Sequence, residues 1–213
     1  MFGPGIGEIE RGKFAEPQPL YWQTDTAIAR NSWCYTTTLD YKSSSEIIRD
    51  LIEAVSKNGN MLLNVGPDGQ GKIHDKDQEI LADIGAWLTM NGAAIYESKP
   101  WRIAGEGPTT ITAGQFQENK VTQYTSQDFR FTIQGDSLYA MQMISPMDGH
   151  ACIQSLSLSS DQNLPAFHGI IQNVALVGHP QQNLDWQATH DGLSINFAPI
   201  ETDKPIVFKI TMK

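Results

Sequence analysis

The sequence is poor in two features that would indicate a charged or a membrane partner. It has 15 Lys and Arg against 24 Asp and Glu, a formal net charge of −9, and so lacks the basic excess that nucleic acid or anionic lipid requires. No stretch approaches the roughly 20 apolar residues of a membrane-spanning helix. The amino terminus MFGPGIGEIERGKF also lacks the basic start and apolar core of a signal peptide. We therefore expect a soluble chain that binds neither nucleic acid nor membrane, and whose ligand is uncharged.

Cysteine is scarce as well, with only Cys34 and Cys152, far apart in the sequence. This pair forms neither a disulfide framework nor a C-x-x-C metal spacing, so we expect two buried thiols and no metal site. The glycine-rich stretch GPDGQG at residues 66–71 lacks the G-x-x-x-x-G-K-[ST] pattern of a phosphate-binding loop. No cofactor is expected.

Up to about residue 97, strand-like runs alternate with helical patterns. The strand-like runs are LYWQTDTAI at residues 20–28 and NMLLNVG at 60–66, and helical periodicity covers residues 44–57 and 75–91. The first helix opens with Ser43-x-x-Glu46, the spacing of a capping box, and Asn91-Gly92 predicts a carboxyl-terminal cap for the second. Strand, helix, strand, helix is the order of parallel β/α units.

After about Pro100 the hydrophobic period becomes two. The alternating segments are FRFTIQG, SLYAMQMI, NVALVG, LSINFA and IVFKITM, and turns such as Gly135-Asp136, Asp148-Gly149 and Asp191-Gly192 separate several of them. This pattern predicts an antiparallel β-sandwich or small barrel. We place the boundary at residues 98–108, rich in Gly and Pro, which gives domains of about 1–98 and 102–213.

Ligands of parallel β/α folds lie at the carboxyl ends of the strands, where the loops are free. The loop after the first predicted strand contains ARNSWCY, residues 29–35, which combines Arg, Asn, Trp and Tyr. Aromatic rings that stack on sugar C–H faces, and amides that bind hydroxyls, are typical of sugar sites. The alternative is that Trp33 and Tyr35 are packing residues.

Three long motifs resemble the carboxy-terminal part of family 29 glycoside hydrolases, the α-L-fucosidases. They are YWQTDTAIARNSWCY, YKSSSEIIRDLIEAVSKNGNMLLNVGPDGQG and IGAWLTMNGAAIYESKPW, and the likeness runs from about Gly7 to Trp101. It is looser beyond Trp101, where the family has a small β-sandwich. The resemblance implies α/β plus all-β architecture: the last two β/α units of a (β/α)₈-like barrel, followed by the sandwich. NMLLNVG resembles the last barrel strand, covered on both faces, and we expect Asn64 at its end to hold the pocket wall by hydrogen bonds.

The resemblance also implies a retaining hydrolysis in which an Asp attacks the anomeric carbon and a second carboxylic acid serves as acid and then as base. In the family that nucleophile, and the histidines and tryptophan that bind the fucose hydroxyls, lie upstream of everything in this sequence. The five histidines match none of these positions, so we expect surface or packing roles for His74, His150, His168, His179 and His190.

The family's acid/base carboxylate precedes the YW strand by about a dozen residues, a place occupied here by GEIERG. We therefore assign Glu10 as the acid/base, with Glu8 in reserve. Such an acid must hold its proton near neutral pH, and this requires partial removal from water or a neighbouring negative charge. A solvated surface role is the alternative for either residue.

Trp33 occupies the place of the aromatic residue that packs on the C5 methyl of fucose, the one wholly apolar projection of this sugar. Trp22 and Gln23 lie on the strand beneath the pocket and are expected at or just behind its surface. Arg11 and Arg30 are placed near substrate, although pairing with neighbouring carboxylates is the favoured role for both.

The sequence thus predicts an α-L-fucosidase that removes terminal fucose from glycans without a cofactor, present as a carboxy-terminal part that is inactive alone. A (β/α)₈ barrel needs about 250 residues, so we expect Met1 to be a truncation or a gene-model start. The alternative is a non-catalytic carbohydrate-binding or interaction module built on the β-sandwich. Secretion or periplasmic export is expected from the family, and the sequence indicates no oligomeric state.

Overall fold

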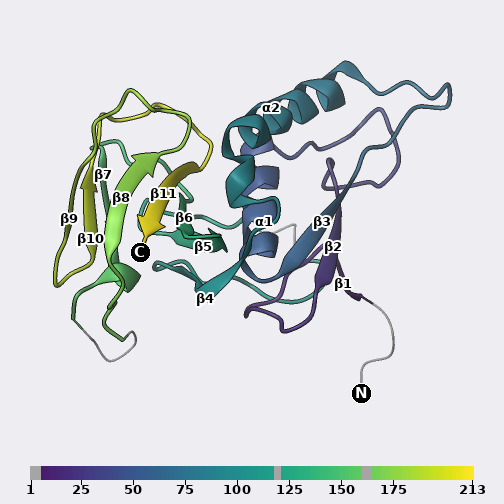
Figure 1. Cartoon of the computed structure of the whole chain (residues 1–213). Coiled ribbons are helices and arrows are strands. Elements are labelled where there is room, and N and C mark those ends of the chain that lie inside the picture. The colour runs from purple at the N-terminus through teal and green to yellow at the C-terminus, as the bar shows by residue number, and fades with distance from the viewer. Residues whose placement is uncertain (1–5, 118–120, 160–164) are drawn as a thin grey trace. The chain divides into compact units, whose positions relative to one another are not determined.

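The computed structural model describes residues 6–117, 121–159 and 165–213. The chain separates into two compact units (Figure 1): residues 1–92 with 110–122, and residues 93–109 with 123–213. The segment 110–122, which follows the boundary expected at residues 98–108, thus returns to the first unit. The expected limits of two independent domains, 1–98 and 102–213, stay a prediction.

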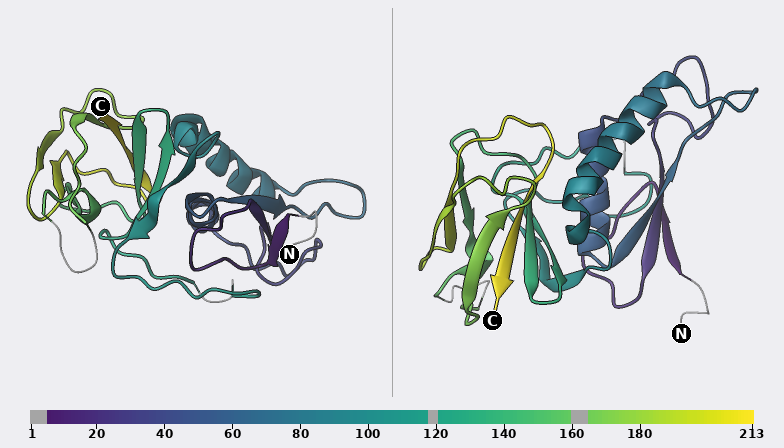
Figure 2. Two further views of the ribbon diagram at one scale, coloured as in Figure 1. Left: turned by 60° about the horizontal axis from the view of Figure 1, so that its bottom comes forward. Right: turned by 45° about the horizontal axis from the view of Figure 1, so that its top comes forward.

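The first unit is built on a parallel sheet of three strands in the order β1-β2-β3. Its elements along the chain are β1 (Gly7–Glu10), β2 (Trp22–Ala27), α1 (Ser44–Ser56), β3 (Gly59–Asn64) and α2 (Asp75–Asn91). In both views of Figure 2 the helix α1 lies along one face of this sheet. The parallel β/α order expected from the sequence is confirmed, and β1 is a strand that the sequence did not indicate.

The two faces of the sheet differ in character. Ile9, Trp22 and Thr24 are buried on the face toward α1, and the Trp22 ring leaves no room for a side chain at Gly59. On the opposite face Leu62 is 54% exposed, and neighbouring positions are polar. The expectation that NMLLNVG is covered on both faces is therefore wrong for the described chain, in which α1 covers only one.

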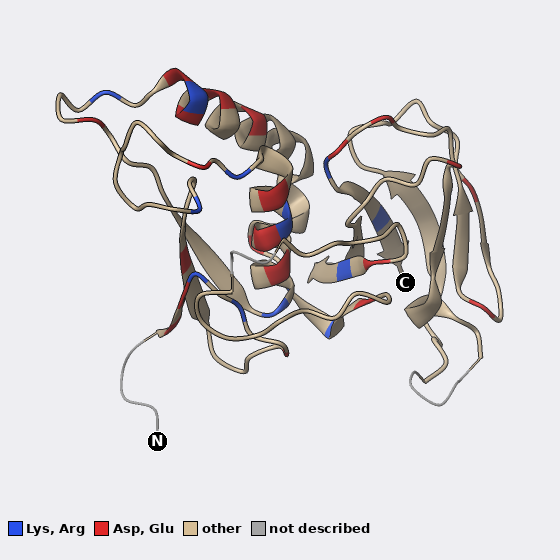
Figure 3. Cartoon of the chain, turned by 180° about the vertical axis from the view of Figure 1, so that it is seen from behind, with Lys and Arg blue, Asp and Glu red and all other residues tan. Residues whose placement is uncertain are grey.

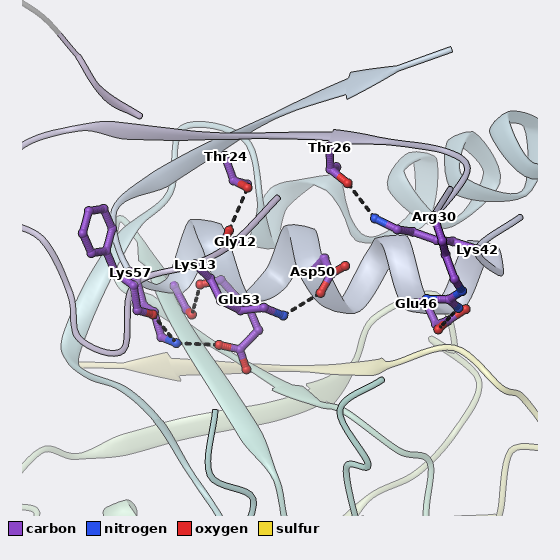
Figure 4. Close-up of polar contacts among 12 residues, drawn as sticks. Gly12, Lys13, Thr24, Thr26, Arg30, Lys42, Glu46, Asp50, Glu53 and Lys57 are labelled. Atoms are coloured by element: carbon purple, nitrogen blue, oxygen red, sulfur yellow. Dashed lines mark hydrogen bonds and ion pairs between the residues drawn. The ribbon is translucent and has the colours of Figure 1, made fainter. Parts of the chain in front are cut away.

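Helix α1 begins as expected and is tied to the sheet by polar contacts. Ser43 and Glu46 form the predicted capping box. Figure 4 shows two contacts that join α1 or its flank to neighbouring segments, Lys13 to Asp50 at 2.7 Å and Lys42 to Thr26 at 2.6 Å, and one within the end of the helix, the buried Lys57 to Glu53 at 2.7 Å. Buried lysines need such partners because an unpaired buried charge is costly. These contacts fix α1 against the strands that carry the candidate site.

Helix α2 ends at Asn91 with Gly92 as its C-cap, as the sequence predicts. Gly92 has φ −57° in the right-handed region and opens the 3-10 helix η1 (Gly92–Ala94), so Asn91-Gly92 does not form a left-handed cap. Figure 3 shows acidic residues along both α1 and α2. No helix in the described ranges combines the length and apolarity needed to cross a membrane.

The second unit consists of two antiparallel sheets. One has five strands in the order β4-β5-β6-β11-β8 and the other has three in the order β7-β10-β9. The bounds are β4 (Lys99–Glu106), β5 (Phe129–Gln134), β6 (Ser137–Gln142), β7 (His150–Ile153), β8 (Ile171–Leu176), β9 (Asp185–Ala188), β10 (Leu193–Asn196) and β11 (Ile206–Met212), with η2 (Gln154–Leu156) after β7. The all-β character expected after Pro100 is confirmed.

Side chains from both sheets form one hydrophobic core, with Phe131, Phe208 and Ile195 fully buried. The turn glycines expected from the sequence are in the left-handed region, with φ 56° at Gly135 and 68° at Gly149. A side chain at Gly149 would also collide with the backbone of Phe197. The expectation of two buried thiols is wrong, because Cys34 is exposed and Cys152 is only half-buried.

Candidate active site

The carboxyl ends of β1, β2 and β3 meet at one edge of the first unit's sheet because the three strands are parallel. Residues 11–13, 28–35 and 65–72 follow these ends. Loops at this edge are free to carry function, since the strands supply a rigid base beneath them. Candidate residues can therefore act together only where they lie near this edge and on the same face of the sheet.

Glu10 is the last residue of β1, and Glu8 lies two positions earlier on the same face. Glu8 is exposed, whereas Glu10 is half-buried. The carbonyl of Glu10 accepts a hydrogen bond from the N–H of Phe116 at 3.0 Å. The returning segment 110–122 therefore holds the backbone of Glu10 on one side while β2 holds it on the other. Of the two carboxylates, Glu10 has the more fixed position and lies closer to the loops.

Trp33 lies in the loop after β2 and is half-buried. The Arg11 guanidinium carbon is 4.1 Å from the centre of the Trp33 ring, and Arg11 Nη1 donates to the carbonyl of Arg30 at 2.9 Å. Asn64 Nδ2 donates to the carbonyl of Trp33 at 2.6 Å, which confirms the hydrogen-bonding role expected of Asn64. Gly66 packs so closely that a Cβ there would lie 2.7 Å from the Tyr35 nitrogen. The Trp33 loop is thus held from β1 and from β3.

Trp22 and Gln23 are neighbours in sequence but lie on opposite faces of the sheet. Trp22 is 1% exposed, donates from Nε1 to the carbonyl of Lys57 at 2.9 Å, and meets Phe14 edge to face. This placement favours a packing role for Trp22 over contact with a substrate. Gln23 is half-buried and pairs in register with Glu8, so it shares the face of the two candidate carboxylates.

The two arginines have different environments. Arg30 pairs with Glu46, and its Nε lies 3.9 Å from Asp40 Oδ2. The expected pairing with carboxylates is therefore confirmed for Arg30. Arg11 lies on the Trp33 ring and donates to the carbonyl of Arg30. Its backbone φ of 47° directs the chain sharply away after β1. Arg11 therefore connects the end of β1 to the Trp33 loop.

Asp25 is a site residue that the sequence did not single out. It pairs in register with Glu10 across β1 and β2, so the two carboxylates share one face at one level of the sheet. Its Oδ1 is buried and has no hydrogen-bond partner among the described residues. Native proteins rarely leave a buried carboxylate oxygen unpaired, and such atoms point to function or to an absent partner. The sequence signal for Asp25 was its position between Thr24 and Thr26 in the strand segment TDT, where both threonines are buried on the other face.

His74 has the packing role expected of it. Its ring stacks on Tyr35 with centres 4.0 Å apart, and its Nε2 lies 3.4 Å from Asp68. His150 is exposed, as the expected surface role requires. In the part of the chain that the structure describes, no three His, Cys, Asp or Glu side chains are placed to hold a metal ion.

The Glu46 carboxylate gives a pH-dependent prediction for the first unit. Burial raises its pKa, but hydrogen bonds from Arg30 and Ser43 outweigh burial and hold the pKa below its usual value. A lowered pKa in the folded state stabilises the fold above the unfolded pKa near 4.5, and this contribution is lost as pH falls through the folded pKa. Glu46→Gln should therefore cost about 1 kcal/mol at pH 7, a figure reduced for solvent screening. The difference should shrink below about pH 4.

Urea unfolding at pH 7 and pH 3.5 measures the Glu46 effect, followed by tryptophan fluorescence, to which Trp22, Trp33 and Trp87 contribute from the first unit. The matched control is Glu79→Gln on α2, which removes an exposed pair with Lys76 and should change stability little at either pH. A Glu46→Gln cost that is the same at pH 7 and pH 3.5 would contradict the assignment.

Comparison with known proteins shows which family the chain resembles. The sequence model of the family described as Alpha-L-fucosidase matches residues 5–93. The tissue alpha-L-fucosidase of Homo sapiens is 37% identical over 146 residues, which are 66% of this chain and 28% of the relative. That of Rattus norvegicus is 34% identical over 142 residues, or 65% of this chain and 27% of the relative. The chain thus spans less than a third of the length of these curated relatives.

Solved structures extend the likeness to almost the whole chain. Alpha-L-fucosidase isoenzyme 1 from Paenibacillus thiaminolyticus matches with a TM-score of 0.74 and 25% identity, covering 98% of this chain and 45% of that one. The Thermotoga maritima alpha-fucosidase in complex with fucose matches with a TM-score of 0.70 and 23% identity, covering 98% and 43%, and this likeness concerns the fold alone. The likeness to the α-L-fucosidase family thus spans residues 5–93 by its sequence model and about two thirds of the chain by its curated members.

Proposed function

We propose that this chain carries the acid/base side of a retaining α-L-fucosidase, and that its parallel sheet is the last part of a (β/α)₈-like barrel. The proposed substrate is a glycan that ends in α-L-fucose. A single observation carries the proposal: Glu10 ends β1 at the same sheet edge as the Trp33 loop, and Arg11 joins the two. The family likeness supports this assignment, and the polar face that holds Glu8, Glu10, Gln23 and Asp25 fits the interior of such a barrel.

In the proposed reaction, Glu10 as a carboxylic acid gives its proton to the glycosidic oxygen as the C1–O bond breaks. An aspartate from the preceding part of the family fold attacks C1 and forms a glycosyl ester. Glu10, now a carboxylate, removes a proton from water, and the resulting hydroxide displaces the aspartate and releases fucose. Proton and leaving group therefore balance without a metal or cofactor.

The position of Glu10 suits this role because a general acid must lie within hydrogen-bond reach of the glycosidic oxygen, and Glu10 ends β1 beside the Trp33 loop. Asp25, on the same face and at the same level, adds a second carboxylate beside it. We propose Asp25 as a second carboxylate of the site, placed beside Glu10 by the register of β1 and β2.

The test is an assay of the product of the gene's full reading frame, which contains residues 1–213 and is called here the full-frame protein. It is incubated with 4-nitrophenyl α-L-fucoside and with the matching β-D-galactoside. Release of nitrophenol from the fucoside alone, with retention of configuration in the first product, supports the proposal. A folded full-frame protein that hydrolyses neither glycoside would leave the non-catalytic module as the better hypothesis.

Trp33 gives a prediction about specificity. If its ring reads the C5 methyl, Trp33→Ala should reduce the preference for an L-fucoside over the L-galactoside, which carries a hydroxymethyl group in that place. The expected loss is about 1–3 kcal/mol, the range for apolar pockets that recognise small groups. The ratio of kcat/KM for the two nitrophenyl glycosides measures it.

The control for Trp33 is Trp33→Phe, which keeps an aromatic face over Arg11 and should retain most of the preference. Circular dichroism verifies that both variants fold. An unchanged preference in a folded Trp33→Ala variant would assign the ring to packing against Arg11.

A further inference from the structure

A cavity of about 580 Å³ opens within the second unit, apart from the residues of the candidate active site. Its wall is formed by the end of β4, the turn before β5, and β7 with the residues on either side of it. The polar side chains among its lining include those of Glu106, Gln127, Asp148, His150 and Gln154. The volume lies in the range of small-molecule pockets and far exceeds the space of one water molecule.

The wall formed by the end of β4 and the turn before β5 is held in place by the buried carboxylate of Asp128. Asp128 is 0% exposed and accepts backbone hydrogen bonds from Thr109 at 3.0 Å and from Thr125 at 2.7 Å. Gly107 has φ +121° and packs so closely on Asp128 that no side chain fits there. The segments that bear Gly107 and Gln127 are therefore held in place independently of any ligand.

The wall formed by β7 and the residues on either side of it is also held in place. Glu106, on the five-stranded sheet, accepts the N–H groups of Gln154 and Ser155 through its two oxygens, each at 2.7 Å, and so reaches across to the end of β7. His150 Nδ1 lies 3.0 Å from Asn196 Oδ1 on β10, which orients the ring. A wall built in this way loses little conformational entropy on binding, and such preorganisation favours affinity.

The lining excludes several classes of ligand. Its charged groups are Glu106 and Asp148, and no Lys or Arg lines it in the described part of the chain. Phosphate, sulfate and carboxylate ligands would therefore meet repulsion. A metal ion is disfavoured as well, because the described residues place no suitable set of ligands. Burial, with help from Glu106 and Asp191, raises the pKa of the Cys152 thiol, so that the thiol keeps its proton and is a poor nucleophile.

Two classes then remain, organic cations and neutral polyhydroxylated molecules. Sites for organic cations rely on aromatic faces and on free carboxylates. In the described lining the one aromatic ring is that of His150, both Glu106 oxygens accept backbone N–H groups, and Asp148 Oδ1 accepts the N–H of His150. The two glutamine amides can each donate and accept, as hydroxyl groups require. The lining therefore favours hydroxyls over a cation.

We propose that this cavity is a second carbohydrate site, which binds one or two neutral sugar units of a glycan. It goes beyond the proposed hydrolysis, because it retains a sugar without cleaving it. It would add a weak second contact to a glycan or to its neighbours, and paired weak contacts raise the overall binding strength.

The experiment uses residues 1–213 and the full-frame protein, with methyl β-D-galactopyranoside and methyl α-L-fucopyranoside as neutral probes. Choline chloride tests the cation alternative, and sodium glucuronate tests an anion. Backbone amide shifts in two-dimensional NMR locate the binding, and titration gives Kd. The variant is Gln127→Ala with Gln154→Ala, which leaves the backbone hydrogen bonds of both residues intact. The matched control is Gln172→Ala, an exposed glutamine on β8 outside the lining.

We expect saturable shifts at His150 and Gln154 with at least one methyl glycoside, and about 10-fold weaker binding in the double variant, as the loss of two neutral hydrogen bonds implies. Gln172→Ala should bind like the parent, and the double variant should hydrolyse 4-nitrophenyl α-L-fucoside normally. Shifts with choline alone, no shifts at these residues, or equal binding by the double variant would overturn the proposal. Hydrolysis separates the two hypotheses. A full-frame protein that binds sugar here but hydrolyses no fucoside contradicts only the proposed fucosidase activity. A full-frame protein that hydrolyses the fucoside but binds no sugar here contradicts only the proposed second site.

Discussion

In the full-frame protein, Glu10→Ala is expected to slow the hydrolysis of alkyl α-L-fucosides, whose leaving groups are poor, by about 10²–10⁴-fold. The reason is that an alkoxide cannot depart without a proton, and Glu10 is the carboxyl group at the end of β1 beside the Trp33 loop. A dinitrophenolate departs without such help. Formation of the fucosyl ester from 2,4-dinitrophenyl fucoside should therefore be almost unchanged.

The second half of the reaction gives an independent check on Glu10. Without its carboxylate, water has no base, so the fucosyl ester should accumulate and steady-state turnover of the activated substrate should slow after a burst. Azide needs no base, so added azide should restore turnover and yield fucosyl azide. Stopped-flow release of dinitrophenol and mass spectrometry of the product measure both effects.

Glu8→Ala is the matched control, since Glu8 lies on the same strand and the same face but is exposed. It should leave both substrates nearly unaffected. If azide rescues a slowed Glu8→Ala variant while the Glu10→Ala variant stays active, Glu8 and not Glu10 is the acid/base residue. Equal losses on both substrates for Glu10→Ala, without rescue, would indicate that Glu10 is a structural residue.

Much of the first unit could be predicted because its signals are local. The runs at residues 20–28 and 60–66 became β2 and β3, and the helical periodicity of residues 44–57 became α1, with Ile47, Ile48 and Ile52 buried. β1 was not predicted because it has only four residues, of which Ile9 is the single apolar one. It is a strand only through its pairing with β2. β4 was not predicted because Pro100 and Gly105 interrupt its alternation of apolar and polar residues. Its pairing with β5 also shifts register between these two residues.

The candidate site was predictable in position but less so in side-chain direction. Alternation along YWQTD shows that Trp22 and Gln23 face opposite ways, but which of them faces the core depends on the partner, and Gly59 makes room for Trp22. The return of residues 113–117 to the backbone of Glu10 and Arg11 is a tertiary pairing without a local sequence signal. Asp25 was missed for a related reason, since its significance comes from its register with Glu10.

The same geometry predicts that residues 1–213 on their own have no fucosidase activity. Retaining hydrolysis requires two carboxyl groups about 5–5.5 Å apart, one of which forms the covalent ester. The family resemblance implies that this nucleophile matches none of residues 1–213. Glu8 and Asp25 lie on the same face as Glu10, but neither matches the family's nucleophile. Purified residues 1–213 should release no nitrophenol from 4-nitrophenyl α-L-fucoside under conditions in which the full-frame protein does.

The stability of the two units should differ in the same sample. In the first unit β1 and β3 are the outer strands of a three-stranded sheet. One face of that sheet leaves Leu62 54% exposed, and Leu20 and Tyr21 nearby are 63% and 67% exposed. Unpaired strand edges beside exposed apolar side chains favour aggregation and local unfolding. The second unit instead encloses a core shared by two sheets. Limited proteolysis should therefore cut within residues 1–92 and 110–122 first.

The proteolysis has a specific signature, because β4 pairs with β5 across the segment 110–122. Cleavage in that segment should leave a peptide of about residues 93–109 bound to residues 123–213, so the two should elute together from a sizing column and separate only in denaturant. The full-frame protein under the same protease treatment is the control and should resist cleavage in residues 1–92, because the rest of the proposed barrel would cover the exposed face. Equal resistance of both units in residues 1–213, together with hydrolysis that Glu10→Ala abolishes, would mean that this chain supplies a nucleophile of its own.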